Sequence, residues 1–350
     1  MSQPDLLDVS HLGGWAAQWD ALVDSSPLPS PFLRSWWLGT GGARRHFLLV
    51  VDETRLLGGL ALEKAHALSR IHMMGDGHLC PDHLDLLAAS GHEEVVTRVL
   101  RDWLCRSGPR LFNLRGVRAG SRLIQALPGP VRCDPVGAAP YALLPDCPDA
   151  FRAGLSSHLR RKISTTTKRL AAEGVTHQIV RGPALLSRLS MLRRLHRSRW
   201  GNRSDFLPAF DRFTAGCAGG CAADEVVIHE LRNHDLVVAM VLTFEVARRV
   251  SVYQSARLTD RRWRDSGTLL FAAAIEDACA RGFTEVDFLR GEESWKARFS
   301  SGHRPIVRLV AGKGVTGRVG CALDAASAFG AQTAVRGVRL GREAMARWRS

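Results

Sequence analysis

The segment from residue 250 to residue 299 constrains the fold more than any other part of the chain. It contains an apolar strand pattern at 250–256, a helix pattern that opens at Gly267 and ends at Gly282, and a second strand pattern at 284–289. A basic loop joins the first strand to the helix. Because the first N–H groups of a helix have no partners within it, such a unit can hold an anionic ligand at the helix start. The pattern therefore predicts a mixed α/β fold with a functional site at this loop.

The neighbouring residues predict the other elements of the same unit. Helix patterns with apolar residues about every 3.6 positions cover 150–173 and 183–199, and a Gly/Ala-rich helix or loop follows at 205–223. Three strand patterns then form an antiparallel meander, and a short helix and a final strand complete the unit. These elements are expected at residues 226–231, 236–246, 250–258, 292–299 and 306–310.

The first 145 residues run through a similar order of patterns in a weaker form. A helix pattern is followed by a strand hairpin, a second helix and a short strand, expected at residues 14–23, 46–51, 56–62, 92–107 and 111–114. Pro140, Pro145 and Pro148 then cluster in a way that is typical of a domain boundary. We predict a domain at 1–145, a second domain at 146–312 and a basic tail at 313–350.

The positive charge of the chain is concentrated in two places. The formal net charge is +14, and residues 151–200 carry 12 Lys and Arg against one acidic residue, while residues 313–350 carry 7 against 2. A localised basic block favours a partner with phosphates or carboxylates, such as a membrane surface or a tRNA. A solvated helix face without a ligand is the alternative.

Other features argue against several classes of protein. The longest apolar run, at 236–244, is too short to span a bilayer, and the N-terminus lacks a basic signal region, so a cytoplasmic protein is expected. The eight cysteines are dispersed without a CxxC pair, which favours free thiols. Neither a GxSxG nor a Walker A motif is present. No metal is expected, and one His/Asp group is most simply polar loop residues: His72, Asp76, His78, Asp82, His83 and Asp85.

Two groups of residues carry the candidate chemistry. In the loop before the helix, Gly267 has no Cβ and allows a phosphate to approach the backbone, with arginines on the entry side. The predicted phosphate-binding residues are Arg264, Ser266, Gly267 and Thr268. In the second group, Asp287 lies at the end of a strand, and Glu292 and Glu293 face Lys296 at helical spacing, which also describes ordinary side-chain pairing.

On these residues, the chain resembles the acetyltransferase-like (GNAT-type) proteins of bacterial cellulose and exopolysaccharide biosynthesis, which are related to the Fem-type aminoacyltransferases of peptidoglycan. The resemblance covers residues 150–312 well and extends more weakly over 1–145. The motifs that carry it are 81–85, 155–163, 195–200, 266–270, 287–292 and 295–299.

The resemblance implies tandem GNAT-like domains, each a mostly antiparallel mixed sheet flanked by helices, with a cleft between them. It implies transfer of an acyl group from acetyl-CoA or another acyl-CoA to an amine or hydroxyl of a small or polysaccharide-precursor acceptor, by direct attack. Asp287 is the first choice for the base, with Glu292 and His229 as alternatives, and Tyr253 for protonating the leaving thiolate. The residues expected to bind substrate are Trp200, Arg290, Lys296 and Arg298.

One departure from the family pattern leaves other functions open. Leu269 occupies the last small position of the usual acyl-CoA loop, and Fem-type relatives use an aminoacyl-tRNA donor instead. Aminoacyl transfer from tRNA is therefore one alternative, with the basic block at 151–200 binding the RNA. A non-catalytic scaffold of a polysaccharide-synthesis complex, with the basic tail on anionic lipid, is another.

Overall fold

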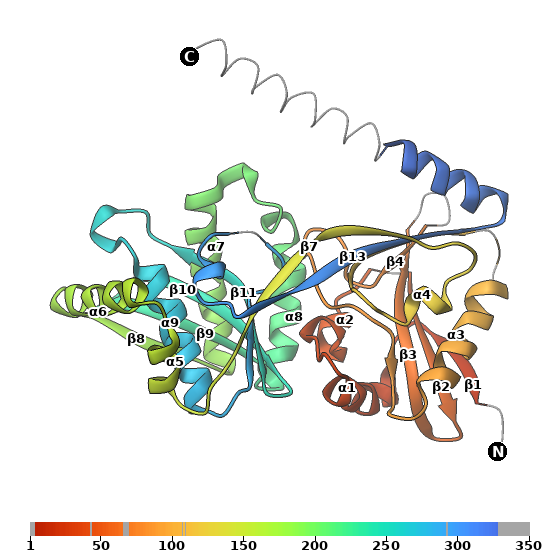
Figure 1. The fold of residues 1–350 in the computed structure, drawn as a ribbon, viewed down its shortest axis with the longest axis horizontal. Coiled ribbons are helices and arrows are strands. Elements are labelled where there is room, and N and C mark those ends of the chain that lie inside the picture. Colours follow the sequence, from red (N-terminus) through yellow and green to blue (C-terminus); the bar gives the residue numbers. More distant parts are fainter. Residues whose placement is uncertain are drawn as a thin grey trace, which may run out of the picture.

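A computed structural model describes residues 4–42, 44–65, 70–106, 108, 110–291 and 293–327. The described residues form a 13-stranded mixed sheet with helices on its faces (Figure 1). Its strands are β1 (Asp5–Val9), β2 (Arg45–Asp52), β3 (Arg55–Lys64), β4 (Arg70–Met73), β5 (Leu87–Ala88), β6 (Arg110–Arg118), β7 (Arg132–Leu143), β8 (Val175–Val180), β9 (Val226–Asn233), β10 (Leu236–Val246), β11 (Arg249–Arg257), β12 (Glu285–Asp287) and β13 (Gly302–Lys313).

The α-helices lie between these strands in the chain. They are α1 (Ala16–Ser25), α2 (Ser35–Leu38), α3 (Glu93–Arg106), α4 (Leu123–Ala126), α5 (Pro148–Gly154), α6 (Ser157–Ala172), α7 (Pro183–Trp200), α8 (Phe210–Ala222) and α9 (Ser266–Ala280). Residues 314–327 are also helical, and the rest of the predicted basic tail lies outside the described residues. In the described part of the chain, no helix is both long and apolar enough to cross a membrane.

The strand order reveals two copies of one arrangement. Along the sheet the order is β1-β2-β3-β4-β6-β13-β7-β12-β11-β10-β9-β8, so each half contributes four antiparallel strands followed by a parallel one. In the first half α3 connects β4 to the parallel strand β6, and in the second half α9 connects β11 to β12. The predicted tandem α/β arrangement is confirmed.

The two halves exchange their last strands, which the sequence patterns did not predict. Strand β7 follows the first half but pairs with β12 of the second, and β13 follows the second half but pairs with β6 of the first. The two exchanged strands also pair with each other along most of their length, and they cross between the lobes in Figure 1. The sheet is therefore continuous, and the division of the chain at residue 145 remains a prediction.

Two hydrophobic cores cover opposite faces of the second half. Met240, Leu242 and Phe244 of β10 belong to a large core that includes α7, α8 and the first half, whereas Ala239 and Val241 belong to a smaller core with α5, α6 and α9. This alternation follows from the two-residue period of a strand with both faces buried.

The elements of the structure differ from the predicted ones in three places. The helix expected at 150–173 is two helices, because Leu155 is extended and the Ser156 hydroxyl caps a new helix by accepting the N–H of Leu159 at 3.3 Å. The proline-rich segment expected to be a boundary is partly strand, since β7 runs through Pro140 to Leu143. The final strand is longer than predicted and joins both halves.

Candidate functional site

The site begins where two parallel strands separate. Strand β12 pairs with β11 only from Arg249 to Ser251, whereas β11 continues to Arg257. Beyond the paired part, residues 252–255 of β11 and 288–290 after β12 line opposite walls of a cavity of about 540 Å³. The equivalent gap in the first half is filled by its own chain, because Leu84 forms a parallel bridge with Val117 of β6. The open splay thus belongs to the second half.

Three further parts of the chain line this cavity, which we call the larger cavity to distinguish it from a second one described below. Besides the splayed strands, its walls come from the loop before β5, from the last turn of α7 and from the segment after β12. The side chains that matter below are Asp82, His196, Arg199, Trp200, Tyr253 and Arg290.

A smaller cavity of about 200 Å³ lies at the start of α9. It is lined by β10, the end of β11 and the first turns of α9, and it shares Arg199, Ser255 and Trp295 with the larger cavity. The Trp295 ring is stacked on Phe271 of α9, with centroids 3.8 Å apart. The two cavities are therefore adjacent, with Trp295 at their junction.

The predicted phosphate-binding loop lies at the smaller cavity. Arg264, Gly267 and Thr268 line it, whereas the Ser266 side chain is buried and its hydroxyl has no hydrogen-bond partner among the described residues. Asp265 precedes α9 in a left-handed conformation, with φ of 67°. The structure therefore brings three of the four predicted phosphate-binding residues together at the start of a helix.

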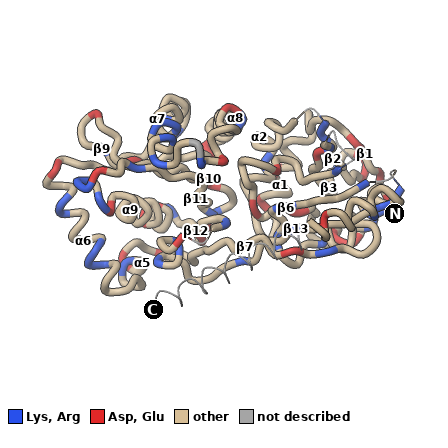
Figure 2. The backbone as a smooth tube through the Cα atoms, turned by 90° about the horizontal axis from the view of Figure 1, so that it is seen from above, with Lys and Arg blue, Asp and Glu red and all other residues tan. Residues whose placement is uncertain are grey.

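The charges around the smaller cavity are mainly positive. Its one lining carboxylate, Asp265, is paired with Lys162 of α6 at 2.8 Å, while Arg199, Arg257 and Arg264 also line the cavity. The loop is tied to α6 because Arg169 donates to the carbonyl oxygens of residues 262 and 264. Figure 2 shows Lys and Arg residues along α6 and α7 beside this region. An anion at the start of α9 would meet both the helix dipole and these cations.

The preferred catalytic base, Asp287, lies in an environment that suits a structural role better. Its side chain is fully buried, ion-paired with Arg249, 2.7 Å from His83 Nε2, and accepts the N–H of Leu289 at 2.6 Å. Burial opposes its ionisation, but His83 and Arg249 outweigh burial and hold the pKa of this carboxyl below its ordinary value. A low-pKa carboxylate with its lone pairs occupied is a poor proton acceptor. Asp287 also does not line the larger cavity.

Tyr253 does line the larger cavity, but its hydroxyl is engaged. It donates to the carbonyl oxygen of Leu79 at 2.8 Å, and the ring packs against Phe32, Phe213 and Phe244. Burial raises the pKa of this phenol. Tyr253 therefore keeps its proton, and it would have to turn from Leu79 to donate to a leaving group.

The predicted substrate-binding residues are brought together only in part. Trp200, Arg290 and Lys296 line the larger cavity. However, the Lys296 ammonium donates hydrogen bonds to the carbonyl oxygens of Leu289 and Arg290, at 3.2 and 3.0 Å. Arg298 is exposed and does not line either cavity. Glu292 lies outside the described residues.

Two residues that sequence reasoning did not assign to catalysis also line the larger cavity. Asp82 is buried, its Oδ2 accepts the N–H of Arg290 at 2.7 Å, and its Oδ1 has no hydrogen-bond partner among the residues that the structure describes, although Arg290 Nε lies 3.4 Å away. Burial raises the pKa of this carboxyl. The His196 ring bonds Ser204 through Nε2 at 2.8 Å, and its Nδ1 has no partner among the described residues. Both residues stand in motifs noted in the sequence, at 81–85 and 195–200.

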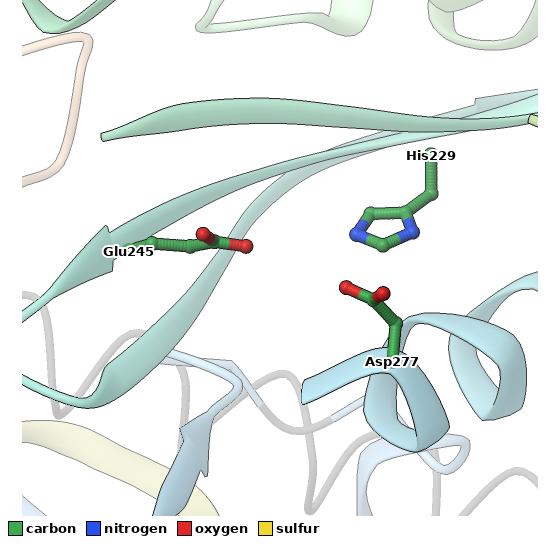
Figure 3. Close-up of side chains that lie close together, drawn as sticks. All are labelled: His229, Glu245 and Asp277. Atoms are coloured by element: carbon green, nitrogen blue, oxygen red, sulfur yellow. The ribbon is translucent and has the colours of Figure 1, made fainter. Parts of the chain in front are cut away.

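The predicted alternative base His229 belongs to a different cluster, away from both cavities. Figure 3 shows it beside Glu245 and Asp277, and the three could offer metal ligands within 4.8 Å of one another. However, Arg281 pairs with both carboxylates and Arg181 also pairs with Glu245. Because these arginines already compensate the charges, we assign no metal to the cluster.

The His/Asp group at residues 72–85 does not gather around a single point. His83 pairs with Asp287, and Asp85 pairs with Arg118. Asp82 faces Arg290 instead. These side chains therefore serve separate contacts.

Comparisons with known proteins show what the chain is similar to in sequence and in fold. Residues 157–297 match the family model of the acetyltransferase (GNAT) domain. The fold resembles the crystal structure of FemX, with a TM-score of 0.61 at 11% identity over 87% of this chain and 96% of that one.

Two further solved structures are similar in fold, and the first of them is described as a domain of a putative lysylphosphatidylglycerol synthetase. One is the C-terminal domain (DUF2156) from Agrobacterium fabrum, with a TM-score of 0.58 at 12% identity over 87% of this chain and 94% of that one. The other is L-PGS from Bacillus licheniformis, with a TM-score of 0.51 at 13% identity over 78% and 84%. No curated protein matches the chain significantly in sequence. Residues 157–297 are thus similar to the acetyltransferase (GNAT) domain, and the fold of the chain is similar to that of these structures.

Proposed function

We propose that this protein is an acyltransferase that moves an acyl group, in the simplest case acetyl, from acyl-CoA to an amine or hydroxyl acceptor. The observation that carries the proposal is the pair of adjacent cavities. One lies at the basic start of α9 and the other in the open splay between β11 and β12. A donor with phosphates and a reactive thioester needs both features side by side.

The donor is held at the smaller cavity. Its diphosphate lies against the N–H groups at the start of α9, near Arg264, Gly267 and Thr268. The thioester reaches the splay, where the backbone of β11 beyond Ser251 is not paired with β12. Free N–H groups of this strand polarise the thioester carbonyl and stabilise the oxyanion that forms on attack.

The acceptor enters the larger cavity and loses a proton during attack. Asp82 is the residue best suited to take that proton, because it lines the cavity, its Oδ1 accepts no hydrogen bond from the described residues and burial raises its pKa. The acceptor nitrogen or oxygen bonds to the acyl carbon, the C–S bond breaks, and the thiolate takes a proton from Tyr253 or from water. Asp82 belongs to the first half of the chain, so the proposed reaction needs both halves.

The acceptor class follows from the resemblance to the exopolysaccharide-related proteins and from the side chains of the cavity. Trp200 has an exposed fraction of 41% and offers a ring face, and Arg290 offers a cation. A sugar ring with an anionic group would use both. A precursor of a polysaccharide is therefore the proposed acceptor.

Aminoacyl transfer from tRNA is the second candidate. It is favoured by the fold similarity to FemX and by the basic helices α6 and α7 next to the donor cavity. In that case the RNA backbone lies on these helices, and its affinity falls steeply with salt.

Thermal unfolding with acetyl-CoA separates the two donors. A ligand at about 100 times its dissociation constant adds about 2.7 kcal/mol of stability. We expect a salt-tolerant rise in melting temperature that Gly267→Glu abolishes, because the added carboxylate takes the place of phosphate.

The matched control for this variant is Gly14→Glu, at an exposed glycine that lines neither cavity. It should keep the full shift. The absence of a shift in the unmodified protein, together with salt-sensitive tRNA binding, would move the assignment to aminoacyl transfer.

A further inference from the structure

Donor groups of Trp37 and Arg212 come together beside Gly75 without an acceptor. Trp37 of α2 has an exposed fraction of 1%, and Arg212 of α8 is half-buried. The Nε1 of Trp37 and the Nε and Nη2 of Arg212 are buried atoms that have no hydrogen-bond partner among the residues that the structure describes. Neither residue lines the larger or the smaller cavity, so these donors lie outside the candidate active site.

Gly75 marks the point at which the donors converge. A Cβ at this glycine would stand 3.4 Å from Trp37 Nε1 and 3.7 Å from Arg212 Nη2. Apart from the chain neighbours of Gly75, no other described heavy atom would lie closer than Pro81 Cγ at 4.0 Å, so an atom fits at this point without a clash. A single small ligand there therefore reaches both side chains.

The positive charge of Arg212 has no carboxylate partner within the described part of the chain, since its two buried nitrogens accept no contact from one. Asp76 is the carboxylate that follows this point in the chain. It pairs with His72 at 3.5 Å and accepts the N–H of Gly77 at 2.7 Å. The carboxylate nearest in sequence is therefore engaged elsewhere.

The neighbouring tryptophan shows which kind of ligand suits such donors. Trp36 Nε1 donates to the carboxylate of Glu225 at 2.7 Å, and Arg34 pairs with the same carboxylate. An indole N–H and a guanidinium thus share one anionic acceptor in this part of the fold. Trp37 and Arg212 present the same two donor types, and no described carboxylate accepts from them.

Donors that stay unpaired inside a protein destabilise the folded state, and a charged donor does so more than a neutral one. A water molecule at this point would accept hydrogen bonds but leave the charge of Arg212 uncompensated. An anion accepts the hydrogen bonds and compensates the charge, and hydrogen bonds to an ionised partner are the stronger ones. An anion is therefore favoured over water.

We propose that Trp37 and Arg212 form a binding site for a small anion, a halide such as chloride, beside Gly75. The three donor atoms are shielded from solvent, which suits a monatomic ion better than a phosphate or a larger carboxylate. Trp37 belongs to the first half of the chain and Arg212 to the second. The anion thus links the two halves.

The bound anion also supports one wall of the larger cavity. Gly75 lies in the loop that follows β4, and residues 78–80 of the same loop line that cavity. The carbonyl oxygen of Leu79 accepts from Tyr253, and Asp82 follows shortly after in the chain. An anion at Gly75 therefore fixes the segment that leads to Asp82, whichever acyl donor the protein uses.

The test measures melting temperatures of the full chain while sodium chloride replaces sodium gluconate at constant ionic strength. Gluconate is too large for the site. Chloride binding to the folded state should give a saturable rise of at least about 2 °C. Sodium acetate is the third salt, and a rise with acetate but none with chloride would overturn the halide assignment.

Two variants each remove one donor group. Trp37→Phe keeps an aromatic ring but loses the N–H, and Arg212→Gln loses the charge; each should abolish the chloride-dependent rise. Trp19→Phe is the matched control for the first, because Trp19 Nε1 is buried and donates to the carbonyl oxygen of Leu33 at 2.7 Å. Arg194→Gln, at an exposed arginine, is the control for the second. Both controls should keep the full rise. Because each variant is compared with itself in two salts, a general loss of stability does not affect the result.

The position of the ion is checked in crystals grown in sodium bromide. An anomalous peak between Trp37 Nε1 and Arg212 Nη2 is expected. The proposal is overturned by water at that position, by the absence of any chloride-dependent rise, or by a rise that both variants keep. Each of these outcomes leaves the proposed acyl transfer to be judged by its own binding experiment with acetyl-CoA.

Discussion

Replacing Asp287 by Asn tests whether this residue holds the site together or carries out the chemistry. In the structure the carboxylate accepts from Arg249 and from the N–H of Leu289, and it faces His83 Nε2 at 2.7 Å. The amide of Asn keeps one acceptor oxygen, but its NH₂ group is a donor and would face groups that themselves donate, such as the Arg249 guanidinium. Removing one partner of a buried ion pair costs about 3 kcal/mol, because the remaining charge stays buried without compensation.

The expected loss is large enough to measure in two ways. Urea unfolding followed by tryptophan fluorescence should show a decrease of about 3 kcal/mol in the free energy of unfolding. For a chain of this size that corresponds to a fall in melting temperature of about 4 °C. Asp102→Asn is the control, since its pair with Arg106 is solvent-exposed and should contribute less than about 1 kcal/mol.

The opposite result would return Asp287 to the catalytic role that the sequence pattern indicated. If Asp287→Asn unfolds within about 1 kcal/mol of the unmodified protein while turnover collapses, the structural assignment is wrong. If stability falls but turnover per folded molecule is kept, the base must be another residue. His83, which contacts Asp287, belongs to the first half of the chain and directly follows Asp82. The outcome for Asp287→Asn therefore also concerns the first half.

Three further predictions concern the base, the donor loop and the buried histidine. Asp82→Asn should lower the rate of acetyl transfer at least about 100-fold with acetyl-CoA affinity unchanged, because it removes the proton acceptor; a normal rate in steady-state assays would exclude Asp82 as the base. Thr268→Glu should weaken acetyl-CoA binding as Gly267→Glu does, and unchanged affinity by titration would show that the donor lies elsewhere. Burial lowers the pKa of His229 to about 3, so the unfolded state binds a proton first as the pH falls below about 6.5. Stability should therefore decrease by about 2 kcal/mol between pH 7 and pH 5, and His229→Leu should lose this component; equal pH profiles for both proteins would contradict the reasoning.

The sequence alone determined the local elements of the second half. The alternation of apolar residues in 226–258 predicted the meander, and the apolar helix between Gly267 and Gly282 was predicted within about two residues. These signals are local, because strand and helix periods are set by neighbouring residues. The loop at the start of α9 could be recognised for the same reason, because its basic residues and Gly267 are neighbours in the sequence.

Only the tertiary structure decided how the halves combine and which side chains form the site. The exchange of β7 and β13 depends on pairing between strands that are distant in the chain, such as Leu143 with Glu285 and Arg118 with Ile306, and prolines in β7 obscured it. The position of Asp287 at the end of a strand suggested a catalytic base, but in the structure His83 and Arg249 contact its buried carboxylate. Asp82 and Arg290 are separated by 208 positions in the chain, yet they meet in one cavity wall. The role of a charged side chain depends on its partners and its burial, and both are properties of the folded chain.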